Sequence, residues 1–125
     1  MKAVQVNAED LGTLNKWCIQ WGKGPFPDGW LPKTGLWVKD IIAGFIYKTD
    51  SSLAFIECII SNPKASKADR REAFLVLEKA LCENAKKSGY AYLQGITCNR
   101  SVADVGKASD WTLTDYKYAG MVKVL

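Results

Sequence analysis

The sequence contains no histidine among its 125 residues. Histidine is the usual general base near neutral pH and a common zinc ligand, so its absence excludes Ser-His-Asp catalysis, Cys-His catalysis and zinc sites built from cysteine and histidine. Any chemistry must therefore use carboxylates, tyrosine, cysteine, lysine and backbone dipoles.

Closely spaced cysteines are also lacking. Cys18, Cys58, Cys82 and Cys98 lie far apart, and no two of them form a CxxC pair. Such spacing gives little support to metal ligation or redox chemistry. We expect reduced, mostly buried thiols and no bound metal.

Long apolar runs, low-complexity segments and internal repeats are missing as well. The first ten residues, "MKAVQVNAED", have no apolar core of the kind that a leader sequence needs, so we expect a cytoplasmic protein with no membrane partner. With 48% hydrophobic residues, a chain of this length can bury one core, and we predict a single domain over residues 1–125.

The charged residues are balanced and interspersed. Seventeen Lys and Arg against thirteen Asp and Glu give a net charge of +4. This distribution favours a small anionic ligand over nucleic acid, because the cations are few and the aromatic residues form no stacking platform.

The first third of the chain predicts a strand, a helix and a loop. Residues 2–6 alternate like a strand, and residues 7–21 have helical spacing after a cap at Asn7. Gly and Pro fill the loop that follows, which carries Phe26 and Trp30. These two aromatic residues either bind substrate in a lid or fill the edge of the core.

Three β-rich segments follow, over residues 35–40, 41–50 and 51–61. They predict an antiparallel meander. The third segment contains "LAFIECII", which is apolar at both alternating sets of positions, so we expect a central strand with both faces covered. One carboxylate, Glu57, lies in the middle of this run.

A helix is predicted from Ser66 to Gly89, with Ser66 and Asp69 as a capping box. Residues 90–98 read as a further strand, 99–109 as a short helix or irregular turn, and 110–125 as two closing strands. This order predicts an α+β fold with a mostly antiparallel mixed sheet flanked by helices.

With these elements in place, the sequence resembles the GNAT N-acyltransferase superfamily over nearly its whole length. The stretches that carry the resemblance are "AFIECIISNP", the following "SKADRREAFLVLEKALCENAKKSGY", and "ITCNRSVADVGKASDW". The resemblance implies acetyl transfer from acetyl-coenzyme A to an amine on a small molecule or a protein. It also implies that the diphosphate is held at the start of the long helix, where backbone amides face outward. The cofactor-binding positions implied are Ile59, Ile60, Ser66, Lys67, Ala68, Asp69, Arg70, Arg71 and Asn99.

Both family motifs are altered in this chain. The phosphate loop Q/R-x-x-G-x-G/A falls on Ser66, Asp69 and Arg71, none of which is the expected residue. A capped surface helix with solvated charges is the alternative reading of this segment. In the second motif, N-x-x-A, Asn99 matches, but Gly106 occupies the position of the tyrosine that protonates the leaving thiolate.

The resemblance also assigns catalytic roles. A carboxylate among apolar side chains has a raised affinity for protons, which a general base working near neutral pH requires, and the family's base falls near Glu57. A structural role for Glu57, paired with a neighbouring cation or with water, is the alternative. Tyr116 is the candidate for the missing acid, and Tyr118 and Cys98 are alternatives to it.

Two functions therefore compete. The first is an acetyl-coenzyme A-dependent N-acetyltransferase with Glu57 as base and with Phe26 and Trp30 at the acceptor pocket. The second is a GNAT-like fold that has lost catalysis and serves as a binding or structural module. Small divergent proteins of this type occur in phage and prophage genomes. The resemblance therefore also predicts that this protein has a phage or prophage origin. Free strand edges are compatible with a homodimer.

Overall fold

The computed structural model describes residues 1–97, 100–112, 114 and 122–125. The elements in chain order are β1 (Ala3–Gln5), the 3-10 turn η1 (Ala8–Asp10), α1 (Leu11–Gln20), β2 (Gly35–Val38), β3 (Ile42–Tyr47), β4 (Leu53–Ser61), α2 (Lys67–Lys87), β5 (Tyr92–Gly95) and α3 (Arg100–Ala108). The chain separates into two compact units, residues 1–94 and 95–125. A single domain over the whole chain stays a prediction.

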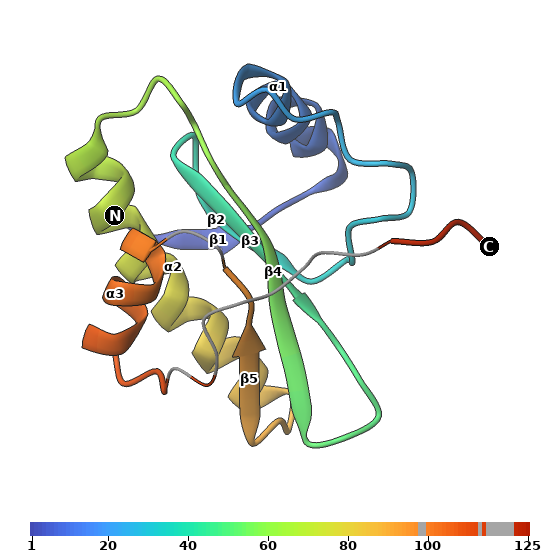
Figure 1. Ribbon diagram of the computed structural model, residues 1–125, viewed down its shortest axis with the longest axis vertical. Coiled ribbons are helices and arrows are strands. Elements are labelled where there is room, and N and C mark those ends of the chain that lie inside the picture. The colour runs from blue at the N-terminus through green and yellow to red at the C-terminus, as the bar shows by residue number, and fades with distance from the viewer. Residues whose placement is uncertain (98–99, 113, 115–121) are drawn as a thin grey trace. The chain divides into compact units, whose positions relative to one another are not determined.

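The strands form one sheet in the order β1-β2-β3-β4-β5 (Figure 1). Neighbouring strands from β1 to β4 are antiparallel. The amides of Ala91 and Tyr92 both donate hydrogen bonds to the carbonyl oxygen of Ser52, so β4 and β5 start side by side and run in the same direction. The predicted α+β fold with a mostly antiparallel mixed sheet is confirmed.

Local signals place the helix boundaries where they were predicted. The Asp10 carboxylate accepts a 2.8 Å hydrogen bond from the Asn7 amide at the start of the first helical segment. The Ser66 hydroxyl caps α2 by accepting from the Asp69 amide at 3.0 Å. The helix ends just before Gly89, whose φ of 92° reverses the chain at a conformation that favours glycine.

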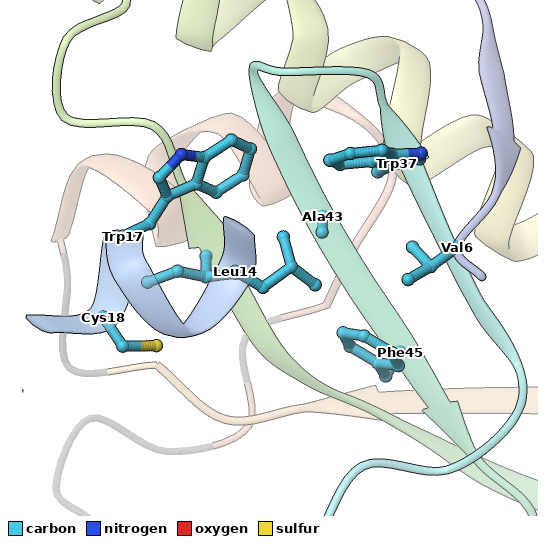
Figure 2. Packing of buried hydrophobic residues seen from close by; sticks show 8 residues of the cluster. Val6, Leu14, Trp17, Cys18, Trp37, Ala43 and Phe45 are labelled. Carbon is cyan, nitrogen blue, oxygen red and sulfur yellow. The ribbon is translucent and has the colours of Figure 1, made fainter. Parts of the chain in front are cut away.

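One face of the sheet packs against α1. Helical residues Leu14 and Trp17 meet strand residues Trp37 and Phe45 in a buried cluster (Figure 2). The two indole rings lie 6.1 Å apart between centroids and are tilted by 42°, an arrangement that aromatic pairs favour. Val6, Cys18, Ala43 and Ile60 complete the buried part of this cluster.

The other face of the sheet packs against α2. The buried stripe of that helix consists of Ala73, Leu77, Leu81 and Ala85. A Cβ atom added to Gly44 of β3 would lie 3.1 Å from Leu81 and 3.3 Å from Leu77. Glycine therefore lets the helix approach the sheet closely here.

A β-bulge interrupts β4. Ala43 pairs with Ile60 and Phe45 pairs with Glu57, so Gly44 alone on β3 faces the two residues Cys58 and Ile59 on β4. Cys58 has a φ of 56°, a left-handed conformation that is uncommon for residues other than glycine. Such bulges bend a strand and turn its side chains away from simple alternation.

The bulge overturns one prediction about β4. Glu57 and Ile59 are both exposed, although we predicted a strand covered on both faces. Ala54, Ile56 and Ile60 are buried as predicted. The apolar pattern therefore predicted burial correctly towards the two ends of the strand but wrongly at its centre.

The end of the chain is described only in part. Residues 113 and 115–121 of the predicted closing hairpin over 110–125 lie outside the described residues, and the described remainder of that segment contains no strand. The short helix is present as α3. Within the described segments, none of the helices has the length and apolarity that crossing a membrane requires.

Candidate functional site

Tyr47 connects the bulge to the preceding loop. Its hydroxyl donates a 2.9 Å hydrogen bond to the carbonyl oxygen of Trp30 and lies 3.3 Å from the sulfur of Cys58. Because a phenol has only one proton to donate, the Cys58 thiol is the donor in the second contact when the first is formed. One hydroxyl therefore joins the loop over residues 22–34 to the strained residue of β4.

Burial raises the pKa of the Tyr47 hydroxyl. Desolvation, followed by the hydrogen bond with Cys58, raises the pKa of the Tyr47 hydroxyl well above its ordinary value. Burial likewise raises the pKa of the Cys18 thiol in the adjoining cluster. Near neutral pH, Tyr47 thus stays protonated and retains its hydrogen bond to the loop.

Glu57 lies beside this group but in contact with water. It pairs with Phe45 across the sheet, and paired residues share a face, so its side chain is on the α1 side. Phe45 is only 1% exposed, whereas Glu57 is exposed. The burial that we predicted for Glu57 is therefore wrong, because the strand bends at the next two residues. Its charge also lies close enough to Tyr47 to contribute to the raised pKa of that hydroxyl.

The loop places its two aromatic residues differently. The Phe26 amide donates a 2.9 Å hydrogen bond to the side-chain oxygen of Asn15, and its ring packs against the core cluster. Trp30 is 41% exposed. Phe26 thus has the core-filling arrangement that the sequence left open, and only Trp30 presents a large surface to solvent.

In the turn between β4 and α2, several backbone amides donate hydrogen bonds to acceptors within the same segment. Asn62 accepts from the Lys64 amide through its side chain at 2.9 Å and from the Ala65 amide through its carbonyl at 3.1 Å. At the helix start, Ser66 accepts from the Asp69 amide through its hydroxyl. The amides of Lys67 and Ala68 come too early in the helix to have a partner within it.

The cations of this helix start differ in their surroundings. Lys67 and Arg71 are exposed, while Arg70 is half-buried with its guanidinium carbon 5.3 Å from the centre of the Trp21 ring. The Trp21 indole N–H donates a 2.7 Å hydrogen bond to the carbonyl oxygen of Ser61, the last residue of β4. Trp21, at the C-terminal end of α1, is 44% exposed.

No protein-family model matches this sequence, and no curated protein matches it significantly. Among solved structures, wild-type TTHA1254 from Thermus thermophilus superposes with a TM-score of 0.71 at 18% identity, covering 98% of this chain and 97% of that one. The structure of a probable acetyltransferase gives 0.70 at 13% identity and covers 100% and 99%. An aminoglycoside acetyltransferase from an uncultured soil metagenomic sample, in complex with sisomicin, gives 0.61 at 11% and covers 99% and 95%.

This chain has the GNAT acetyltransferase fold. The likeness extends over essentially the full length of each chain, and it confirms the fold that the sequence predicted. At these identities the likeness concerns the fold, so the roles of individual residues depend on the geometry of this chain.

The predicted site residues fall into three groups according to where they lie in the chain. Ser66, Lys67, Ala68, Asp69, Arg70 and Arg71 lie together at the start of α2. Glu57 and Ile59 are exposed at the bulge, while Ile60 is buried beside it. Asn99 and Tyr116, together with the alternatives Cys98 and Tyr118, lie outside the described residues.

Sequence reasoning did not find Tyr47 or Cys58 as site residues. A left-handed cysteine has no signature in a single sequence, and the partner of Tyr47 in the loop lies seventeen residues away. A hydroxyl at the end of the apolar strand "IAGFIY" was the only available signal. Across the part of the chain that the structure describes, no group of three or more Cys, Asp or Glu is arranged to hold a metal ion.

Proposed function

We propose that this protein transfers an acetyl group from acetyl-coenzyme A to the amine of a small molecule. The observation that supports the proposal best is the bulged β4 leading directly into the capped start of α2, within a fold shared with acetyltransferases. Bulges occur often beside active sites, where they re-aim side chains. The start of a long helix attracts anions.

The start of α2 has donors that suit a diphosphate. The amides of Lys67 and Ala68 are available in the first turn, and the side chains of Lys67, Arg70 and Arg71 add positive charge. Asp69 opposes binding in part, since its carboxylate lies in the same turn. The net charge of these four side chains is still positive, so the segment fits an anionic ligand.

Glu57 is the proposed general base. Its position next to the bulge and its contact with solvent allow it to accept a proton from an incoming ammonium group, either directly or through water. Its negative charge also favours a cationic acceptor over a neutral one. Tyr116 remains the proposed acid for the departing thiolate.

The acceptor is proposed to be a small amine that contacts Trp30. This ring is exposed on a loop that Tyr47 holds against the sheet, and exposed rings on anchored loops are well suited to binding. One structural neighbour is an aminoglycoside acetyltransferase, which is in keeping with a small polyamine acceptor. We also propose a cytoplasmic location. A homodimer and an origin in a phage or prophage remain hypotheses.

Calorimetry with coenzyme A, followed by acetyl transfer to a panel of polyamines and aminoglycosides, tests the proposal. We expect binding at micromolar to millimolar ligand and transfer that falls about 100-fold or more in Glu57→Gln, the range for loss of a general base. Glu83→Gln, which removes an exposed carboxylate on the outer part of α2, is the matched control. Absence of coenzyme A binding at millimolar concentration would disprove the proposal.

A binding or structural module without catalysis is the second candidate. It is favoured by the turn before α2, in which the side chains of Asn62 and Ser66 already occupy the amides of Lys64 and Asp69. The glycines that would open this turn to a phosphate are absent from residues 62–71. Coenzyme A binding without transfer to any amine, unchanged by Glu57→Gln, would favour this candidate.

A further inference from the structure

We propose that Trp21 is a positioning residue that holds the guanidinium of Arg70 for the diphosphate of the acyl donor. This inference rests on the proposed function, because it concerns how the same acyl donor is recognised. It assigns a role to the C-terminal end of α1, which neither the sequence motifs nor the structural neighbours identified.

The indole of Trp21 has two contacts that fix it between three elements. Its N–H donates to the carbonyl oxygen of Ser61 at the end of β4, with a distance of 2.7 Å. Its ring lies under the guanidinium of Arg70, 5.3 Å from the guanidinium carbon. The ring is thus anchored to the strand by its edge and holds a cation on its face.

Stacking leaves the arginine able to bind a phosphate. A guanidinium is planar, and its five N–H donors lie at its rim, so a ring below its face does not occupy them. The attraction between the cation and the ring also limits the orientations of a long side chain, which reduces the entropy lost when a ligand binds. Arg70 is accordingly half-buried, whereas its neighbour Arg71 is exposed.

The backbone at this position offers fewer donors than a glycine-rich loop. Asn62 binds the amides of Lys64 and Ala65, and Ser66 binds the amides of Asp69 and Arg70. Recognition of a diphosphate must then depend more on side chains. Arg70 is suited to this task, because an arginine can form two parallel hydrogen bonds to one phosphate group.

The experiment compares coenzyme A with pantetheine, which lacks all phosphates. Dissociation constants for coenzyme A are measured by calorimetry, and those for pantetheine by ligand-observed NMR. The variants are Arg70→Gln, Trp21→Leu and Trp21→Phe, with Arg71→Gln as the matched control that removes the same charge one residue later. Far-UV circular dichroism and thermal unfolding show whether each variant is folded.

We expect Arg70→Gln to weaken coenzyme A binding about 10-fold to 100-fold, as for loss of a charge-assisted hydrogen bond, and Arg71→Gln to weaken it less than about threefold. Trp21→Leu should weaken it about threefold to tenfold, and Trp21→Phe, which keeps an aromatic face, should weaken it less. Pantetheine binding should not change in any variant. If Trp21 and Arg70 had only a structural role, their replacement would weaken the binding of coenzyme A and of pantetheine equally.

Two results overturn the inference while the proposed function survives. One is equal weakening by Arg70→Gln and Arg71→Gln, which would mean that charge alone matters. The other is coenzyme A binding that Trp21→Leu leaves unchanged in a folded protein. Failure of the unmodified protein to bind coenzyme A at millimolar concentration would instead reject the proposed function, and this inference with it.

Discussion

The hydroxyl of Tyr47 lies 3.3 Å from the sulfur of Cys58, at the residue where β4 leaves regular strand geometry. The same hydroxyl binds the carbonyl oxygen of Trp30. A strained backbone position persists only where its surroundings hold it, so Tyr47 contributes both to the bulge and to the placement of the loop.

Tyr47→Phe should destabilise the protein by about 1 kcal/mol. The change removes the hydrogen bond to Trp30 and leaves the Cys58 thiol without its partner oxygen, while the ring stays in place. Urea denaturation measures the free energy of unfolding. Tyr92→Phe is the control, because Tyr92 is 66% exposed and its hydroxyl should contribute almost nothing. Equal losses in the two variants would contradict the role given to Tyr47.

Gly35→Ala should destabilise the protein by about 1–3 kcal/mol, the usual range for overpacking. A Cβ atom at position 35 would lie 2.3 Å from the ring of Phe45, which is buried on every side and cannot move away without disturbing the core. The loss should appear in urea denaturation and in thermal unfolding.

Gly12→Ala is the control for Gly35→Ala, and it should change stability in the opposite direction. Gly12 lies in α1, and a Cβ atom there would meet nothing within 4 Å apart from its chain neighbours and the backbone of its own helix. Alanine should therefore stabilise the helix by up to about 1 kcal/mol. If both alanine variants shift stability in the same direction, packing at Phe45 is not what decides the effect.

The long helix and the order of the strands were predictable because their signals are local. Ser66 caps α2 and Gly89 reverses the chain after it, and both residues act on backbone groups within a few positions. The apolar alternation that predicted the sheet likewise depends on neighbouring residues. These features could be identified without knowing what packs against them.

The candidate site was less predictable because it depends on contacts between distant parts of the chain. The continuous apolar run "LAFIECII" favoured a buried Glu57, but the bulge at the next two residues exposes it. The contact between Trp21 and Arg70 joins the end of α1 to the start of α2. Nothing in the helical spacing of residues 7–21 indicates that Trp21 packs beside a cation, and only the folded chain shows this contact.

Ser66→Ala should destabilise the protein by about 1 kcal/mol, the typical effect of losing an N-cap side chain. The hydroxyl of Ser66 accepts from the Asp69 amide at 3.0 Å, and alanine cannot replace this acceptor. Thermal and urea unfolding measure the loss. Ser88→Ala is a suitable control, since Ser88 follows the C-terminal end of the same helix and is exposed. A loss of similar size in the control would mean that capping is not the cause.

Cys82 should make the protein less stable at alkaline pH. Burial, and then the 3.3 Å hydrogen bond to the Glu78 carboxylate, raises the pKa of the Cys82 thiol from 9.0 to about 12. Between these values the unfolded chain releases the thiol proton while the folded chain retains it. The unfolded state therefore binds fewer protons, and the free energy of unfolding falls as pH rises from about 9 towards 12. Below pH 9 the thiol is protonated in both states, and its stabilising contribution is complete.

Cys82→Ala tests this pH dependence directly. The variant should lose some stability at pH 8, because a half-buried side chain is truncated, but its stability should then fall less steeply than that of the unmodified protein between pH 9 and 11. Urea denaturation under reducing conditions at several pH values measures both slopes. Lysines and tyrosines that titrate in the same range affect the two proteins equally, so the difference between the slopes isolates the thiol. Parallel slopes would show that the Cys82 thiol ionises alike in the folded and unfolded chains, contrary to the burial and hydrogen bonding described above.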